Sequence, residues 1–253
     1  MSETPLPLYV TKFFNAEKNW NDYSNGSFKI GTLSSYRGTE SNALTRMTDQ
    51  EGILNRHFGS GDGTIENLQV RGVSIRDCSF AGGVTWVNVQ SEIDENVFCC
   101  TLGPYDLATH AKILHGHRDP IGGDYEGNSD LDAYAVIELR KFLQGLRFWS
   151  ASSPLITSKL SPFNHIAAKS VRYGGDRSVR YDIDEITNEE NAISSEEYER
   201  VVFDKPSFFS VEKEFRIVLS RTLPIVSFSP LEPLYPQSRR LKNSVVQMGR
   251  WVG

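Results

Sequence analysis

The sequence predicts an α+β fold with a largely antiparallel sheet and peripheral helices. Strand-like runs rich in β-branched and aromatic residues recur at short spacing, with little helical pattern between them. The chain is 39% hydrophobic and 23% charged, which is ordinary for a globular protein, and no repeat, long linker or change of composition divides it. We therefore expect one domain that spans residues 1–253.

The first elements are expected close to the N-terminus. Residues 8–14 combine β-branched and aromatic side chains, which predicts a strand. Asn15 can then cap a short helix that closes at Gly26. Residues 28–30 predict a second strand. The polar, glycine-rich stretch 32–63 lacks hydrophobic periodicity, which indicates a functional loop or a disordered segment.

The middle of the chain predicts further strands and two helices. Residues 105–115 place apolar side chains on one face of a helix, and Gly116 supplies its stop. Residues 117–130 predict a loop, and a short helix is expected around Phe142. Strands are expected at 70–75, 83–90, 96–102 and 134–139.

The last third predicts short strands and an acidic helix. The helix is expected over residues 188–200, with Ser194 or Ser195 as an internal N-cap. The strands are expected at 170–173, 179–183, 213–221 and 223–228, the last two as a hairpin or as adjacent strands.

The net charge argues against a protein that coats nucleic acid through bulk electrostatics. There are 27 Lys and Arg against 32 Asp and Glu, which gives a formal net charge of −5. Residues 239–253 are locally basic and form either a solvated tail or a surface that contacts phosphate. This segment leaves nucleic acid open as a substrate.

The sequence favours a cytoplasmic protein that makes no contact with membranes. No window of 18 residues is apolar enough to span a bilayer. Residues 1–9 lack the basic start and the apolar core of a signal peptide. The 3 cysteines are too few for a disulfide framework, so they are expected to be reduced.

Charged side chains near residue 214 form the first candidate site. If residues 212–219 form a strand, apolar side chains face the core, and Glu212, Glu214 and Arg216 share the opposite face. The Cβ atoms of the two glutamates would then lie about 6.5–7 Å apart. Both carboxylates can reach one small polar ligand, such as the hydroxyls of a ribose. The alternative is a solvated strand face on which Arg216 neutralises its acidic neighbours.

A second candidate site lies in the polar stretch after residue 32. Tyr36 precedes Arg37, and an aromatic ring beside an arginine can stack on a planar group and pair with a phosphate. Arg46, Asp49 and Glu51 can instead stabilise a loop through ion pairs. Both interpretations stay open from the residues alone.

A third group has the residue types of a metal site. His115, His117 and Asp119, with Asp124 nearby, lack a fourth ligand at a diagnostic spacing. A metal-dependent nuclease built on them is therefore the least favoured interpretation, and no metal is expected. The sequence also lacks a phosphate-binding loop and a nucleophile elbow.

Several of these residues resemble a poorly characterised family of bacterial proteins, many of them from prophage or defence contexts. The layout is also similar to a mono-ADP-ribosyltransferase. There, a first strand carries Arg or His, a later strand carries Ser or Tyr under the nicotinamide, and a late strand carries Glu-x-Glu or a lone Glu. The resemblance covers the first quarter and the last fifth of the chain. It is carried by Leu8-Tyr9…Lys12-Phe13, Gly31-Thr32-Leu33-Ser34-Ser35-Tyr36-Arg37…Glu40…Arg46…Asp49…Glu51-Gly52, and Lys205…Phe209…Glu212-Lys213-Glu214-Phe215-Arg216-Ile217.

The resemblance implies an ADP-ribosyltransferase-like split sheet or sandwich and a role for individual residues. Glu214 matches the catalytic glutamate, Glu212 matches the first position of the Glu-x-Glu pair, and Tyr36 would stack on the nicotinamide. The first strand departs from the family because it offers no Arg or His, so Lys12 or Arg37 would hold the phosphates. The implied NAD-binding residues are Tyr9, Lys12, Ser34, Ser35, Arg37 and Arg46.

The reaction that the resemblance implies is transfer of ADP-ribose from NAD, the co-substrate, to a macromolecular acceptor, either protein or RNA. Glu214 would stabilise the positive charge that develops on the ribose, and Glu212 would orient or deprotonate the acceptor. Similar proteins act as toxins restrained by an antitoxin or as phage-defence effectors, so an antitoxin is an expected partner. The competing interpretation is a non-catalytic phage or defence module that binds a nucleotide or a partner.

Overall fold

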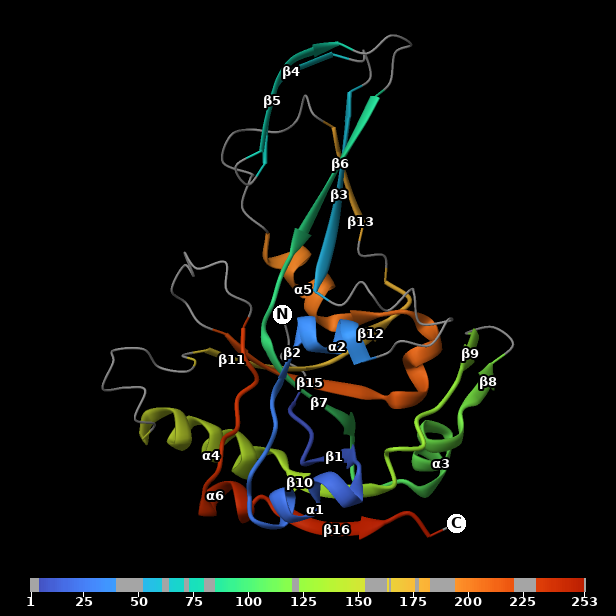
Figure 1. The fold of residues 1–253 in the computed structure, drawn as a ribbon, viewed down its shortest axis with the longest axis vertical. Helices are drawn as coiled ribbons and strands as arrows, with labels where there is room; N and C mark the ends of the chain where they lie inside the picture. The colour runs from blue at the N-terminus through green and yellow to red at the C-terminus, as the bar shows by residue number, and fades with distance from the viewer. Residues whose placement is uncertain are drawn as a thin grey trace.

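The described part of the chain is a mixed α+β structure around an antiparallel sheet (Figure 1). The predicted fold class is confirmed at that level. The computed structural model describes residues 5–39, 52–60, 64–70, 73–79, 85–119, 123–152, 163, 165–175, 178–182, 194–220 and 231–252.

The central sheet unites strands from distant parts of the sequence. All its pairings are antiparallel. The interior strands are mostly buried, so both faces of the sheet need cover. The order is β11 (His165–Ser170), β15 (Glu214–Ser220), β7 (Asn96–Leu102), β1 (Tyr9–Phe14), β10 (Ala133–Glu138) and β16 (Val245–Arg250), and the short β2 (Gly31–Thr32) also pairs with β7.

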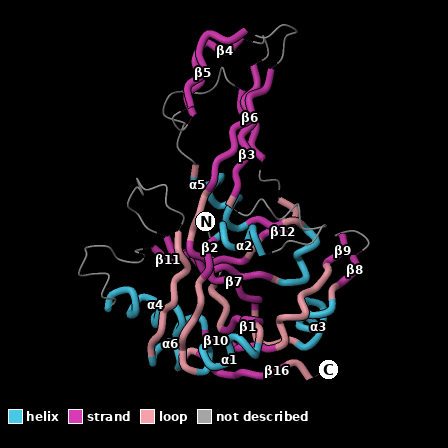
Figure 2. Tube along the Cα trace, in the orientation of Figure 1, coloured by secondary structure: helices cyan, strands magenta, loops and turns pink. Residues whose placement is uncertain are grey.

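Three helices cover one face of this sheet. Phe28, Phe98 and Phe142 meet in the core beneath them, with ring centroids 4.9 to 6.0 Å apart. These contacts join the sheet to the helices through aromatic packing, which stabilises more than area burial alone. The helices are α1 (Ala16–Ser24), α4 (Leu139–Ser152) and α6 (Arg239–Lys242), and they lie close together in Figure 2.

The opposite face carries two apolar clusters. The first, called the α5 core below, joins Leu33 of α2 (Leu33–Thr39) and Val202 of α5 (Ser195–Phe203) to Val218 of the sheet. The second, called the α3 core, joins Ile113 of α3 (Leu107–His115) to Phe13 of the sheet. Helices α2 and α5 therefore cover one part of this face, and helix α3 covers another.

A polar strip crosses the sheet between the two clusters. Thr101 of β7 lies opposite Thr11 of β1 and opposite Glu214 of β15, and all three residues are buried. Paired residues of antiparallel strands project to the same face, so these side chains lie in one row. Buried polar groups at this position need hydrogen-bond or charge partners from the surrounding elements.

A group of strands extends away from the rest of the molecule (Figure 1). β3 (Ile53–Ser60) pairs antiparallel with β6 (Thr85–Glu92) and parallel with β13 (Ser178–Asp182). The hairpin of β4 (Thr64–Val70) and β5 (Val73–Ser79) lies at the far end.

Short elements complete the fold beside α3 and after α5. β8 (His117–Asp119) and β9 (Gly123–Tyr125) form a small hairpin that follows α3. β14 (Asp204–Lys205) follows α5 directly and pairs in parallel with β12 (Arg172–Tyr173). The 3-10 helix η4 (Ser207–Glu212) then leads into β15.

Several elements lie where the sequence predicts them. The strands expected at 96–102 and 134–139 are β7 and β10, and the helix expected at 105–115 is α3. Asn15 caps α1 through its side chain. Ser194 is the N-cap of α5 through a capping box, so it begins the helix instead of lying inside it as expected, and α5 continues past residue 200 to Phe203. In both helices, a capping side chain in the sequence identifies the residue at which the helix begins.

The C-terminal segment 239–253 is not a solvated tail, and that interpretation is wrong. Its residues form α6 and the edge strand β16, which pairs with β10. Leu241 is fully buried because Gly145 of α4 leaves room for it: a Cβ on Gly145 would lie 2.8 Å from the leucine side chain. A buried anchor and a sheet edge therefore order a segment that reads as polar.

Other boundaries also differ from the expectation. The loop expected over 32–63 contains α2 and β3, and the loop expected over 117–130 contains β8 and β9. Residues 28–30 do not form a strand, and only Ile30 forms an isolated bridge, to Leu234. The strand expected at 70–75 includes the end of β4 and the start of β5. Residues 223–228 lie outside the described residues.

Within the described residues, no helix has the length and apolar character needed to cross a lipid bilayer.

Replacing Phe142 by Ala should lower the free energy of unfolding by about 3–5 kcal/mol, because it removes a fully buried ring. Phe148 on the same helix is 45% exposed and serves as the matched control. Its replacement by Ala should cost less than about 1 kcal/mol, mainly through the lost contact with Arg240. Urea unfolding followed by circular dichroism measures both values, and equal losses would contradict this view of the core.

Candidate functional site

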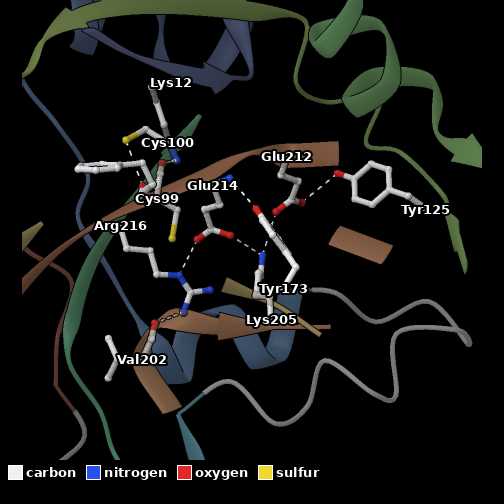
Figure 3. A network of polar contacts seen from close by, with 11 residues as sticks. Lys12, Cys99, Cys100, Tyr125, Tyr173, Val202, Lys205, Glu212, Glu214 and Arg216 are labelled. Carbon is white, nitrogen blue, oxygen red and sulfur yellow. Dashed lines mark hydrogen bonds and ion pairs between the residues drawn. The ribbon is translucent and has the colours of Figure 1, made fainter. Parts of the chain in front are cut away.

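Glu214 is the centre of the polar strip and is only 4% exposed (Figure 3). Its Oε1 accepts a hydrogen bond from Arg216 Nε at 2.6 Å. Its Oε2 forms an ion pair with Lys205 Nζ at 2.7 Å. A single buried carboxylate is thus compensated by two cations from different elements.

The chain brings these cations to the carboxylate in two ways. Arg216 lies two residues after Glu214 on β15, so its side chain projects to the same face of the sheet. Its Nη1 also donates to the carbonyl of Val202 in α5, at 2.5 Å. Lys205 comes from β14, where the chain leaves α5. The guanidinium therefore connects the sheet to the helix that covers it.

Glu212 reaches the same lysine from a different element. It is the last residue of η4, and Lys213 follows in the left-handed region with φ of 45°. The prediction that Glu212 and Glu214 share one strand is therefore wrong, because β15 begins only at Glu214. The turn nevertheless brings Glu212 Oε2 to 2.9 Å from Lys205 Nζ.

The two carboxylates differ in their access to solvent. The Glu212 side chain is 21% exposed, against 5% for that of Glu214. Tyr125 of β9 donates a hydrogen bond to Glu212 Oε1 at 3.1 Å. Glu212 is therefore the carboxylate of this pair that a ligand can contact, and it lies between an ammonium and a phenol.

Burial and charge act in opposite directions on Glu214. Burial raises the pKa of its carboxyl, but Arg216 and Lys205 lower it more, so the pKa lies well below its usual range. The group is consequently ionised at neutral pH. The backbone N–H of Glu214 is also satisfied, because it donates to Tyr173 Oη at 2.6 Å.

Tyr36 lies near this network on the α5 core. Burial raises the pKa of its phenol, and the Cys99 thiol and the Glu214 carboxylate raise it further. Burial also raises the pKa of Cys99 to about 12, with Glu214 as the second cause. Both the phenol and the thiol are therefore protonated at neutral pH. Tyr36 and Cys99 both pack against the α5 core.

The predicted residues of the first strand do not join the carboxylates. Lys12 donates to the carbonyl of Cys99 at 2.7 Å and lies 5.3 Å from the centroid of the Phe98 ring. It projects from β1 to the face opposite Glu214, as Figure 3 also shows. Tyr9 packs beside the α3 core.

The predicted serines make local contacts at the start of α2. Ser34 donates to the Asp94 carboxylate at 2.6 Å, and Ser35 donates to the carbonyl of Thr32 at 2.7 Å. These bonds begin the helix and hold it against the chain near Asp94. The predicted phosphate contacts rest on the side chain of Arg37 and on Arg46, which lie outside the described residues.

The two histidines of the least favoured interpretation, the metal site, make different contacts. His115 contacts the Trp251 ring, with centroids 5.6 Å apart, whereas His117 lines a cavity of about 340 Å³ beside η4. In the part of the chain that the structure describes, no group of three His, Cys, Asp or Glu side chains could hold a metal ion. The side chain of Asp119 is not described.

Sequence reasoning missed the residues that complete the site. Lys205 and Tyr173 come from the two short strands β14 and β12, and Tyr125 lies in a segment expected to be a loop. Lys205 stands in the segment that carries the resemblance, but no role follows for it from the sequence, whereas Arg216 stands two residues from Glu214 and is predicted as its neutralising partner. The others depend on tertiary pairing that no local pattern reveals.

No protein-family model matches this chain, and neither the curated proteins nor the solved structures include a match to it. Any function therefore has to be inferred from the geometry.

Replacing Arg216 by Met should lower the free energy of unfolding by about 3–5 kcal/mol, because it leaves Glu214 with an incompletely compensated buried charge. Replacing the partly exposed Arg200 by Met is the control, and the loss of its contact with Glu196 should cost less than about 1 kcal/mol. Urea unfolding at neutral pH measures both, and a neutral R216M variant would show that the ion pair is dispensable.

The depressed pKa of Glu214 also predicts how stability changes with pH. The carboxylate contributes stability above its ordinary pKa of 4.5, and this contribution is lost as the pH falls below that value. E214Q should therefore lose stability at neutral pH and show a smaller further loss than the wild type on acidification. Unfolding midpoints between about pH 7 and pH 3 test this, and parallel curves would contradict it.

Proposed function

We propose that the protein is an NAD-dependent mono-ADP-ribosyltransferase that modifies a macromolecule, protein or RNA, as a toxin or phage-defence effector. The observation that carries the proposal is the convergence of Glu212 and Glu214 on one lysine nitrogen, at 2.9 and 2.7 Å. Glu212, held by Lys205 and Tyr125 and open to solvent, is a preorganised carboxylate that can stabilise positive charge more in a transition state than in the ground state.

The proposed reaction exchanges one bond at the ribose. The bond from C1′ to the nicotinamide nitrogen breaks, and neutral nicotinamide leaves with the electron pair. A new bond forms from C1′ to a nucleophilic atom of the acceptor, whose proton passes to a carboxylate and then to water. Positive charge accumulates on the ribose between these events.

Glu212 and Glu214 have different roles in this proposal because they differ in solvent exposure. Glu212 has the solvent access needed to face the ribose and to accept the proton. Tyr125 and Lys205 orient it through its two oxygens. Glu214 is a positioning residue, because it fixes Lys205 beneath Glu212. This reverses the emphasis of the sequence resemblance, in which Glu214 contacts the ribose.

The remaining residues fit NAD only in part. The Glu212 carboxylate suits the ribose, but Lys12 does not suit the phosphates, because its ammonium is bonded to the carbonyl of Cys99 on the other face of the sheet. Tyr36 packs on the α5 core beside Cys99. The proposal therefore assigns no phosphate contact to the first strand.

A second candidate function is a non-catalytic module that binds a nucleotide or a partner. The buried compensation of Glu214 by Arg216 favours it, since such a pair also serves a purely structural role. This candidate predicts nucleotide binding without turnover.

Incubating the protein with labelled NAD and whole bacterial lysate separates the two candidates. The transferase should label macromolecules and release nicotinamide, and E212Q should lower both rates at least a hundredfold while its unfolding midpoint stays near that of the wild type. E199Q removes an exposed carboxylate of α5 that pairs with Lys169 of β11, and it should keep full activity. Label transfer that survives in E212Q would refute the assigned role, and binding of NAD without release of nicotinamide would favour the module.

A further inference from the structure

A cavity of about 340 Å³ lies between α3, β8 and η4, outside the Glu214 network. This volume falls in the range of pockets that take small molecules. It is lined by Asp106, Ala108, Thr109, Lys112, His117, Phe208, Ser210, Val211 and Lys213.

The polar lining of the cavity is suited to an anion. Lys112 and Lys213 bring two ammonium groups, and the hydroxyl of Ser210 adds a hydrogen-bond donor. His117 adds a ring that can donate a hydrogen bond. The chain as a whole has a formal net charge of −5, so the two lysines make the cavity more positive than the average of the protein.

Among the described residues of the lining, Asp106 is the acidic one, and it is already engaged. Asp106 caps α3, and its carboxylate accepts hydrogen bonds from the backbone of Ala108 and Thr109 and from the Thr109 hydroxyl. Its ion pair with Lys213 is long, at 3.6 Å. Lys112 makes no ion pair with any described residue and remains exposed. The charge of the lining is therefore not cancelled by its own aspartate.

Lys213 adds an independent observation. It is the only residue other than glycine with a positive φ in the described ranges. Its N–H donates to the carbonyl of Ser210 at 3.1 Å and its own carbonyl accepts from Leu102 at 2.8 Å, so both sides of the turn are fixed. Glycine or asparagine suits this conformation better than lysine does. Backbone strain of this kind is concentrated at ligand sites, and here it directs Nζ to 3.2 Å from Thr109 Oγ1.

The remaining wall is apolar and aromatic. Phe208 and Val211 line it, and the Phe208 ring lies 4.2 Å from that of Phe209, which limits its movement. A fixed aromatic ring beside two cations offers a planar group a stacking surface within reach of its own phosphate.

We propose that this cavity binds a small organic phosphate with a planar ring, of the nucleoside monophosphate class. Lys112 and Lys213 contact the phosphate, Ser210 donates a hydrogen bond to it, and the ring packs on Phe208. The site does not depend on the proposed transferase reaction, since Glu212 projects toward Lys205 and Tyr125 and does not line the cavity.

Isothermal titration of the full chain with AMP, adenosine and inorganic phosphate tests the proposal. AMP should bind at least tenfold more tightly than either of the other two, and its affinity should fall as salt rises. K213G relaxes the backbone and removes one cation, so it should remain folded and weaken AMP binding at least fivefold. K112Q should weaken it by a similar factor. F208A should weaken AMP binding but leave inorganic phosphate unchanged.

The controls separate this site from the rest of the protein. K141Q removes an exposed lysine of α4 that pairs with Glu138, and it should bind AMP as the wild type does. E212Q should also bind AMP as the wild type does, even if it loses transferase activity. Absence of AMP binding, equal affinity for AMP and inorganic phosphate, or unchanged affinity in both K213G and K112Q would overturn the proposal.

Discussion

A carboxylate placed inside a protein loses its hydration, and the surrounding structure must replace it. Glu214 is in this position at the middle of the sheet, with Arg216 on one oxygen and Lys205 on the other. The two cations come from β15 and from the end of α5, so satisfying one charge requires the sheet, the helix and the following short strand to meet at one place. Arg216 adds the carbonyl of Val202 to the same set of contacts.

This requirement also explains why the two glutamates are unequal. Glu214 is surrounded by its compensating charges, whereas Glu212 lies at the end of η4 and keeps part of its surface in solvent. They share Lys205, so the position of the exposed carboxylate depends on the buried one. Precise placement of a reactive group is commonly achieved by residues that do not themselves touch the ligand.

Sequence patterns predicted the parts of this structure that depend on local chemistry. The β-branched runs of β7 and β10, the Asn15 cap and the Ser194 capping box all act over a few residues, and they lie where they were expected. The polar C-terminal strand β16 was misjudged because its order comes from pairing with β10. The break at Lys213 was missed because lysine carries no preference for a positive φ.

In the candidate site too, the residues grouped by local spacing could be predicted, and those brought together by tertiary contacts could not. Glu212, Glu214 and Arg216 could be grouped from their spacing, since a strand period of two places neighbours on one face. Lys205, Tyr125 and Tyr173 are separated from them by turns and short strands, and their approach is decided by tertiary contacts.

The order of strands in the central sheet has a consequence for how the protein forms. β1 is synthesised first among the described strands, yet it lies between β7 and β10, and β10 in turn needs β16 on its outer side. Nearly all neighbours in the sheet are therefore far apart along the chain, which slows folding because loop closure precedes the contacts that reward it. On the ribosome, β1 must wait with its apolar side chains exposed until β7 and β10 emerge. A chaperone that shields this segment would be most useful at that stage of synthesis.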